Sequence, residues 1–161
     1  MPGKPDKTSH FSAYLGNLGG EIFMIRVLFI CHGNICRSPM AEFLLKDIVK
    51  KRGIAADFEI ASAATSREEI GNPVHYGTRN KLAQLGISVA GKHAVQVTKR
   101  DYEYYDLLLV MDSNNIRNLR RVIGEDTQDK VHLLLDYTGR KGASIADPWY
   151  TGDFEVTYKD I

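Results

Sequence analysis

From about residue 24 onward, short runs of consecutive apolar residues alternate with longer stretches of helical periodicity. The runs have the length and the branched aliphatic character of buried strands and lie at residues 27–30, 58–62, 107–110 and 131–135. Between them, apolar side chains recur every three or four positions, as on an amphipathic helix. This alternation predicts an α/β fold, in which helices cover both faces of a four-stranded parallel sheet.

The segments between the strands predict three helices. The first spans about Pro39 to Lys51 and ends at Gly53, and its buried stripe is expected to contain Leu44, Leu45, Ile48 and Val49. The second is expected to open at Asn72-Pro73, an N-cap followed by proline in the first turn, and to end at Gly86. The third carries an apolar stripe of Ile116, Leu119, Val122 and Ile123.

Residues 1–23 differ from the rest of the chain because they are rich in Gly, Pro, Lys and Ser and lack a clear periodicity. We interpret them as an appended leader, with a single domain at 24–161. The alternative is a structured arm that contains Phe11, Tyr14 and Leu15.

The net charge and the cysteine content narrow the range of possible functions and cellular locations. The formal net charge is +1, so no global field favours nucleic acid or a membrane surface, and any anion site must be local. The two cysteines, Cys31 and Cys36, lie five residues apart, which is not the pattern of a disulfide-stapled secreted domain. The apolar runs are too short to span a bilayer. We therefore expect a cytoplasmic protein, either a monomer or weakly self-associating.

The most informative segment follows the first predicted strand, where residues 31–39 read CHGNICRSP. In a tight strand-to-helix loop, successive backbone N–H groups can point toward one anion, and the helix N-terminus adds partial positive charge. Arg37 supplies a planar guanidinium that can bind two phosphate oxygens. We therefore expect a phosphate-binding loop that contains, besides Arg37, the residues His32, Gly33, Asn34, Ile35, Cys36 and Ser38.

Cys31 lies where the same positive field acts on a thiol. The field favours the thiolate, which would be a nucleophile directed at phosphorus, and Ser38 can donate a hydrogen bond to its sulfur. The alternative is that Cys31 and Cys36 are buried apolar side chains and that Arg37 is a surface charge. A cysteine, five residues and an arginine occur often by chance, but the position between a strand and a helix favours the anion site.

Residues 31–42, CHGNICRSPMAE, closely resemble the active-site signature of the low-molecular-weight protein tyrosine phosphatases. The resemblance runs from Met24 to the last residue. It implies a three-layer sandwich with sheet order 2-1-3-4, and a hydrolase that forms a phosphocysteine at Cys31 without a metal or a cofactor. It also implies a C-terminal helix that this chain would complete only in part, so we expect a truncated helix and exposed apolar surface.

The resemblance assigns the general acid to Asp147, in the segment Asp147-Pro148-Trp149-Tyr150 near the C-terminus. A carboxylic acid is needed there because the phenolic oxygen must be protonated as it leaves. Taken alone, Asp-Pro is more often a turn. Together with the cysteine loop it completes a mechanism in which Cys31 attacks, Arg37 stabilises the phosphoryl oxygens and Asp147 transfers protons.

Three further residues correspond to family positions. Ser62 resembles the serine that pairs with the loop asparagine, Asn34. Asp112 and Asn115 follow the third strand, where the family places a carboxylate near the arginine and an adjacent amide. The alternative for both is an ordinary helix cap. His93 corresponds poorly to a histidine of the family's asparagine network, and we do not assign it to the site.

By their positions in the family, the cleft walls are expected to be His32, Ile35, Glu68, Glu69, Trp149 and Tyr150. Two aromatic side chains can hold a phenol ring between them, and a deep pocket favours phosphotyrosine. Glu68 and Glu69 predict a preference for basic residues beside the phosphotyrosine. Ile35 stands where protein arginine phosphatases have a threonine, and isoleucine favours tyrosine.

Several alternatives stay open. A protein arginine phosphatase or an arsenate reductase of the same fold would use the same cysteine, but arsenate reduction needs further cysteines and none follows Cys36. A non-catalytic phosphotyrosine-binding module would lack the nucleophile or the acid. Cys36 either forms a reversible disulfide with Cys31 or packs inside the loop. The expected partners are phosphotyrosine-containing proteins, with phosphate or another oxyanion in the loop.

Overall fold

Four strands form one parallel sheet in the order β2-β1-β3-β4, as the family resemblance implied. The computed structural model describes residues 24–161, so the proposed leader and the alternative arm lie outside the described residues. The strands are β1 (Ile25–Cys31), β2 (Phe58–Ala64), β3 (Leu107–Val110) and β4 (Val131–Leu133). The third strand has the predicted bounds. The second is two residues longer than predicted.

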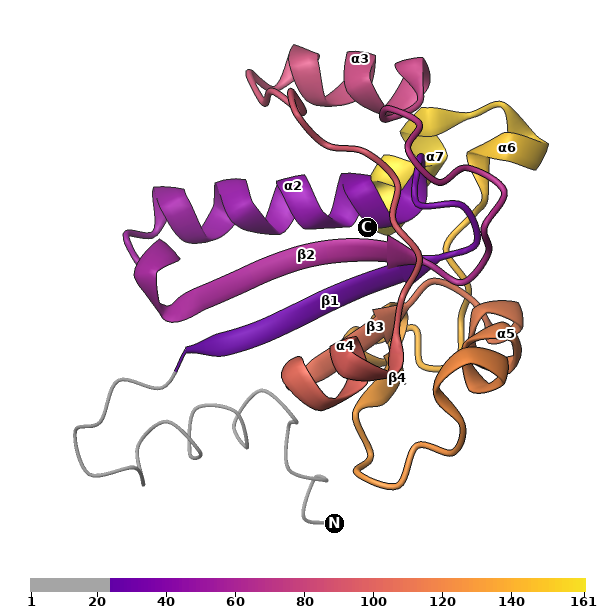
Figure 1. Ribbon diagram of the computed structural model, residues 1–161. Coiled ribbons are helices and arrows are strands. Elements are labelled where there is room, and N and C mark those ends of the chain that lie inside the picture. The colour runs from indigo at the N-terminus through magenta and orange to yellow at the C-terminus, as the bar shows by residue number, and fades with distance from the viewer. Residues whose placement is uncertain (1–23) are drawn as a thin grey trace, which may run out of the picture.

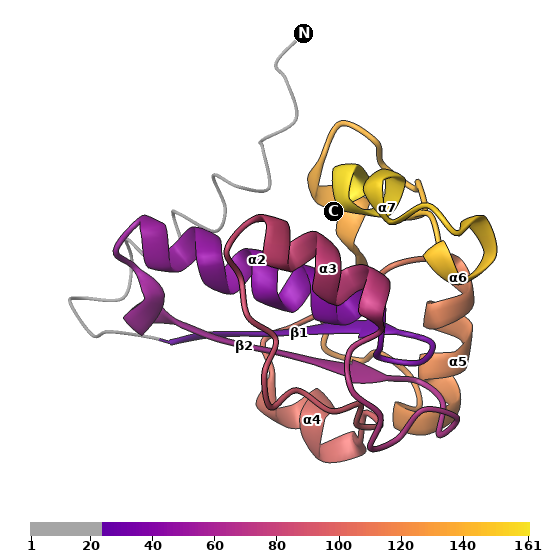
Figure 2. The same cartoon turned by 90° about the horizontal axis from the view of Figure 1, so that it is seen from above.

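Helices cover both faces of this sheet and complete the three layers (Figures 1 and 2). One face carries α2 (Arg37–Lys51), with α3 (Tyr76–Gln84) and α7 (Phe154–Asp160) packed against it, and the other carries α4 (Lys99–Tyr104) and α5 (Ser113–Ile123). The remaining elements are short: the 3-10 helices η1 (Ala55–Asp57) and η2 (Leu134–Tyr137), and α6 (Pro148–Thr151). The predicted α/β class is confirmed. Among the described residues, no helix is both long enough and apolar enough to cross a membrane.

The alternation of β1 explains why both faces are covered. Val27 and Phe29 point into a core shared with α2, whereas Leu28 and Ile30 point into a second core beneath α4 and α5. Successive side chains of a strand face opposite sides, so a strand that is apolar at every position must be buried on both. β1 is central in the sheet, and its C-terminal end delivers Cys31 to the sheet edge.

The first predicted helix is correct in place but not in its buried stripe. The helix begins at Arg37, two residues earlier than predicted. Val49 is buried and Leu44 and Leu45 are partly buried, but Ile48 is 46% exposed, so its assignment to the buried stripe is wrong. Leu44 packs into the small core between α2 and α3, and Ile48 lies one turn farther along, beyond that core.

The predicted start of the second helix is also wrong, because α3 begins at Tyr76 and not at Asn72-Pro73. His75 is the N-cap, and its Nδ1 accepts the Gly77 N–H at 3.1 Å. Asn72 is held in extended pairing, where its carbonyl accepts the Ala94 N–H at 2.9 Å and Pro73 bridges His93. Contacts with a distant segment therefore override a local capping signal. The fourth strand ends at Leu133, because the chain tightens into η2.

The C-terminal helix α7 is docked on α3. The Phe154 ring stacks on His75 with centroids 5.2 Å apart, and Lys81 pairs with Glu155. The ring also lies where a side chain at Gly77 would have to be, because a Cβ there would meet Phe154 carbons at 2.3 Å. Phe154, Tyr158 and Ile161 pack on the core between α2 and α3, and Val156 is 42% exposed. The length of this helix relative to the family's stays a prediction.

The same helix fastens the segment that precedes Asp147. Asp160 accepts the Ala146 N–H at 3.0 Å and a hydrogen bond from Arg140 at 2.7 Å, and the Thr157 hydroxyl donates to the Ala146 carbonyl at 2.8 Å. Burial opposes the ionisation of Asp160, but these hydrogen bonds outweigh it and lower the pKa of the carboxyl. α7 therefore sets the approach of the chain to Asp147.

Replacing Gly77 with alanine tests the docking of α7. Gly→Ala in a helix normally stabilises by roughly 1 kcal/mol, but here the new methyl group overlaps Phe154, and we expect a net loss of about 1–3 kcal/mol. Urea unfolding measures the change, with Asn80→Ala on the exposed face of α3 as the control. A more stable Gly77→Ala variant would show that α7 does not pack as described.

Replacing Asp160 with asparagine tests the anchor of the loop. A carboxyl whose pKa is lowered on folding adds stability above its unfolded pKa, and this stability is lost as the pH falls through the folded value. We therefore expect Asp160→Asn to destabilise the protein at about pH 7, with the difference fading toward about pH 3. Unfolding in urea across this range measures it. Asp129→Asn, at a side chain that is 91% exposed, should show no such trend.

Candidate active site

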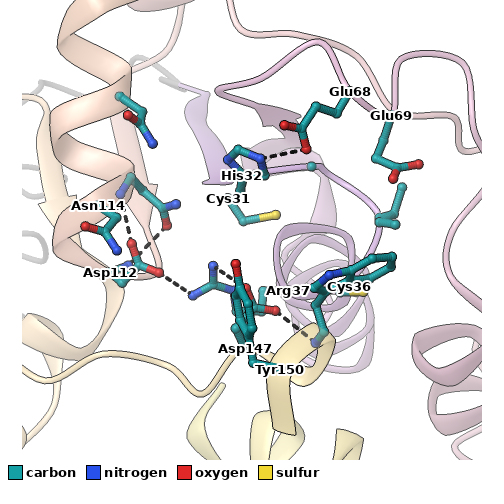
Figure 3. Close-up of a pocket in the computed structure, with 15 residues that line it drawn as sticks. Cys31, His32, Cys36, Arg37, Glu68, Glu69, Asp112, Asn114, Asp147 and Tyr150 are labelled. Carbon is teal, nitrogen blue, oxygen red and sulfur yellow. Dashed lines mark hydrogen bonds and ion pairs between the residues drawn. The ribbon is translucent and has the colours of Figure 1, made fainter. Parts of the chain in front are cut away.

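The segment between β1 and α2 forms the floor of a cleft of about 440 Å³ at the C-terminal edge of the sheet (Figure 3). Parallel α/β sheets place functional loops at this edge. The cleft is lined by Cys31, His32, Gly33, Ile35, Cys36, Arg37, Glu68, Glu69, Asp112, Asn114, Asn115, Asn118, Asp147, Trp149 and Tyr150. The structure thus brings together residues from four separate parts of the chain. Of the predicted site residues, Asn34, Ser38 and Ser62 lie behind the loop, buried.

Asn34 holds the loop in shape. Its φ is 58°, in the left-handed region that asparagine tolerates better than most residues. Its side-chain oxygen accepts the Val95 N–H at 3.2 Å, and its side-chain nitrogen donates to Ser38 Oγ and Ser62 Oγ, both at 2.8 Å. Three partners from different parts of the chain therefore hold Asn34 and, with it, the backbone turn. The predicted pairing of Ser62 with Asn34 is present.

The Cys31 sulfur lies at the bottom of this turn. It accepts the Asn34 N–H at 3.3 Å and lies 3.0 Å from Ser38 Oγ. Cys36 is also buried and free, and burial raises the pKa of its thiol to about 12, with the nearby Cys31 and Asp147 charges adding to the effect. Cys36 is therefore a neutral thiol near neutral pH. Of the two cysteines, only Cys31 receives a backbone N–H on its sulfur among the hydrogen bonds of the described residues.

Arg37 joins three segments beneath the cleft. Its guanidinium is nearly fully buried and donates to Asp112 Oδ2 at 2.7 Å, to the Ile145 carbonyl at 3.1 Å and to Asp147 Oδ2 at 3.3 Å (Figure 3). A buried guanidinium needs such partners, and the carboxylates fix the plane of the fork. Asp147 also accepts the Trp149 N–H at 3.1 Å, so it caps α6 while one oxygen faces the arginine.

The structure combines both interpretations of Asp112 and Asn115. Asp112 is the N-cap of α5 in a capping box with Asn115, and the same carboxylate binds Arg37. Asn115 is buried and accepts the N–H groups of Met111 and Asp112 at 3.0 and 3.1 Å. Capping therefore aims the Asp112 carboxylate at the arginine.

The rim of the cleft is acidic on one side and aromatic on the other. The Glu68 carboxylate lies within hydrogen-bonding distance of His32 Nε2, at 3.0 Å. Asn72 donates a hydrogen bond to Glu69 at 2.6 Å. Trp149 and Tyr150 are 62% and 85% exposed. Both predicted glutamates and both predicted aromatic residues therefore line the cleft.

Two residues behind the loop were missed by sequence reasoning. Glu42 is 3% exposed and accepts the Ser62 hydroxyl at 2.6 Å, and Lys92 lies 3.1 Å from the same carboxylate oxygen. Glu42 is the last residue of the signature motif, which is a signal that could have found it. Lys92 stands beside the histidine that we left out, and the His93 ring contacts only the Gly91 carbonyl at 3.2 Å among its hydrogen bonds in the described region.

Residues 24–161 contain no cluster of His, Cys, Asp and Glu side chains suited to a metal ion. The cleft floor combines the Asn34 N–H on the Cys31 sulfur, the N-terminus of α2 and the buried Arg37 guanidinium, which are groups of the kind that bind anions. A thiol lies at its floor and a carboxylate at its side.

Comparisons with known proteins agree with this geometry. Residues 26–161 match the family described as low molecular weight phosphotyrosine protein phosphatase. The chain is 43% identical over 133 residues to the low molecular weight protein-tyrosine-phosphatase YfkJ of Bacillus subtilis, covering 82% of this chain and 85% of that one. It is 41% identical over 144 residues to the low molecular weight phosphotyrosine protein phosphatase of Mus musculus, covering 86% and 90%.

Solved structures show the same fold. The crystal structure of YfkJ from Bacillus subtilis superposes with a TM-score of 0.82 at 40% identity, covering 87% of this chain and 89% of that one. A YwlE arginine phosphatase mutant with a phosphorylated active-site serine has a TM-score of 0.72 at 25% identity, covering 84% and 86%. The fold is therefore shared by relatives with different named substrates. The match over 26–161 and the identity to full-length relatives show that the chain belongs to the low-molecular-weight phosphotyrosine protein phosphatases.

Proposed function

We propose that this protein hydrolyses phosphotyrosine in proteins through a phosphocysteine on Cys31. The observation that carries the proposal is the convergence of a thiol, a guanidinium and a carboxylate on one cleft, with Arg37 in contact with Asp147 and the Cys31 sulfur beneath an inward N–H group. A thiolate, a bidentate cation and a proton donor are the three groups that phosphoryl transfer to cysteine requires.

In the first step, the Cys31 thiolate attacks phosphorus and forms a P–S bond while the P–O bond to the phenol breaks. Asp147 gives its proton to the departing phenolic oxygen. Arg37 and the loop N–H groups bind the equatorial oxygens, where charge develops in the transition state. The existing contact of Arg37 with Asp147 keeps the acid beside the phosphoryl group.

In the second step, water attacks the thiophosphate, and Asp147, now ionised, takes a proton from it. The P–S bond breaks, and its electron pair returns to the Cys31 sulfur. Ser38, 3.0 Å from that sulfur, can donate to it as the negative charge reappears. Inorganic phosphate is released and the enzyme returns to its starting state.

Tyrosine is the proposed side chain because Ile35 lines the cleft with an apolar surface, and Trp149 and Tyr150 lie at its mouth. A phenol ring gains from burial against such walls, whereas a phosphoserine would not reach them. The second candidate is phosphoarginine, which is supported by the structural likeness to YwlE. Arsenate reduction has less support, because the chain's two cysteines both lie in the loop and Cys36 is held neutral by burial.

The proposed setting is the cytoplasm, where phosphotyrosine-containing proteins would be the partners. Both cysteines are free and buried, five positions apart in one loop, and the nucleophile must stay reduced to act. The chain would act as a monomer or with weak self-association.

Turnover in the presence of EDTA tests the mechanism. Hydrolysis of an aryl phosphate should fall to background in Cys31→Ser, and the reduction in kcat for Asp147→Ala should be about 10²- to 10⁴-fold, as for loss of a general acid. Asp129→Ala, at a strongly exposed side chain, is the control for removing a carboxylate. An active Cys31→Ser variant would contradict the mechanism. Faster release of phosphate from phosphoarginine than from phosphotyrosine would identify phosphoarginine as the preferred substrate and would leave the proposed role of Cys31 unchanged.

The acidic rim predicts a preference for basic flanks. We expect phosphotyrosine peptides with flanking lysine to have a higher kcat/KM than peptides with flanking aspartate. In the double variant Glu68→Gln, Glu69→Gln, the ratio of kcat/KM for the lysine peptide to kcat/KM for the aspartate peptide should fall about fivefold, since exposed ion pairs contribute up to about 1 kcal/mol. Hydrolysis of a small aryl phosphate, which does not reach the rim, is the control. Preference for the aspartate peptides in the unaltered protein would disprove the hypothesis.

A further inference from the structure

The solvent face of α5 carries arginines and no acidic side chain. Arg117, Arg120 and Arg121 are all exposed, whereas Leu119 on the opposite face is buried in the core beneath α4 and α5. No Asp or Glu occurs between Ser113 and Ile123. The helix is therefore divided between an apolar face on the core and a cationic face in solvent.

The arginines of α5 are not balanced in the way that the exposed cations of α2 are. In α2, Lys46 pairs with Glu42 one turn away, and a second pair of the same spacing follows. Arg117 and Arg121 are also one turn apart, but two cations at this spacing repel each other. Glu125 follows Arg121 by four residues but lies beyond the end of the helix. None of the ion pairs within residues 24–161 includes an arginine of α5.

Two of these arginines adjoin the residues of α5 that line the cleft, Asn114 and Asn118. Residues three or four positions apart are neighbours on a helix surface, so Arg117 lies beside Asn114 and Arg121 beside Asn118. The Arg117 guanidinium donates a hydrogen bond to the Asn114 side-chain oxygen, which holds it at this edge of the cleft. Arg120 lies elsewhere, because a helix turns about 100° per residue and Arg120 is therefore about 160° around the axis from Asn118.

The two sides of the cleft consequently differ in charge. Glu68 lines one side, and Figure 3 shows Asn114, on α5, on the other side of Cys31 from Glu68. Arg117 and Arg121 extend the α5 side outward, since they lie beside residues of the cleft but do not line it themselves. A substrate side chain that contacts them would lie outside the cleft, several residues along the peptide from the phosphotyrosine.

Carboxylates are the groups that this pair of arginines is suited to bind. A guanidinium is planar and always charged, and it offers paired N–H donors to both oxygens of a carboxylate. On a helix, side chains one turn apart are separated by about 5–6 Å at their Cβ atoms. Neighbouring acidic side chains of one peptide could therefore reach both guanidinium groups.

We propose that Arg117 and Arg121 form a docking surface for an acidic segment of the phosphoprotein substrate, outside the cleft and on the side opposite Glu68. This inference rests on the proposed phosphotyrosine phosphatase activity and adds a determinant of specificity to it. Basic side chains directly beside the phosphotyrosine face the acidic rim, and acidic side chains farther along the peptide reach α5. The preferred substrate thus carries both charges, at different distances from the phosphotyrosine.

A purely local role for these arginines makes a different prediction. Cations in the last turn of a helix interact favourably with the helix dipole, and Arg120 and Arg121 both lie in the last turn of α5. That role would affect the stability of the fold, and Arg120 would contribute to it as Arg121 does. It would not make the enzyme distinguish one peptide from another.

Two phosphotyrosine peptides test the docking surface. Both carry lysine directly beside the phosphotyrosine, and one has runs of aspartate at its ends where the other has serine. In the unaltered protein at low ionic strength, kcat/KM should be about three- to tenfold higher for the aspartate-ended peptide, through a lower KM, as for one or two exposed ion pairs. This ratio should approach one in high salt, because exposed charges are screened.

Matched arginine variants make the result specific. Arg121→Gln should lower the ratio about two- to threefold, and adding Arg117→Gln should bring it close to one. Arg120→Gln is the control, because it removes an exposed arginine of the same helical turn from the side away from the cleft. In all these variants, kcat for a small aryl phosphate should stay within about twofold of the unaltered value, since none of the three side chains lines the cleft. Urea unfolding confirms that each variant is folded.

Equal kcat/KM for the two peptides in the unaltered protein, or an Arg120→Gln variant that lowers the ratio as much as Arg121→Gln, would overturn the docking surface and leave the phosphatase activity in place. A ratio that is unchanged in the double variant, together with binding to phosphatidylserine vesicles that the double variant loses, would assign the arginines to a membrane surface instead. Failure of the unaltered protein to hydrolyse both peptides and the aryl phosphate would contradict the proposed function and, with it, the docking surface.

Discussion

The catalytic edge of this protein depends on one side-chain amide, that of Asn34. A loop that turns its N–H groups inward toward an anion leaves its own backbone in a conformation that few residues tolerate, and Asn34 adopts it at a φ of 58°. Its amide makes three hydrogen bonds, accepting from Val95 and donating to Ser38 and Ser62. These partners lie on three other elements or loops, so the loop keeps its shape only when the sheet and the segment beside it are assembled.

The positive charge of Arg37 is balanced by two carboxylates, those of Asp112 and Asp147. Arg37 lines the cleft and contacts Asp112 and Asp147, so the carboxylates that orient the guanidinium also lower the free-energy cost of burying it. Behind the loop, Glu42 with Lys46 and Lys92 forms a second balanced group. The first group lines the cleft, the second lies buried behind it, and the loop lies between them.

Asp147, the proposed proton donor, is supported from a different direction. Asp147 belongs to a segment that α7 ties down through Asp160 and Thr157, and α7 is in turn packed on α3 through Phe154. The helix α7 thus acts on the active site indirectly, because it fixes the Ala146 backbone next to Asp147. Cys31, the proposed nucleophile, is held by β1 and α2, so the two halves of the proposed mechanism depend on separate parts of the fold.

By itself, the sequence determined the α/β class and pointed to the loop, because strand burial on both faces and an anion-binding turn each leave a local pattern. The family resemblance led to Cys31 and Arg37 in the signature motif and to Asp147 in the segment 147–150, and the structure places all three at one cleft. Sequence reasoning failed where distant segments compete with local signals. Asn72-Pro73 reads as a helix start but pairs with 93–94, and Lys92 went unnoticed because only the folded chain brings its side chain from another loop to Glu42. Burial of a charge and the direction of a hydrogen bond are properties of assembled neighbours, and only the tertiary structure decided them.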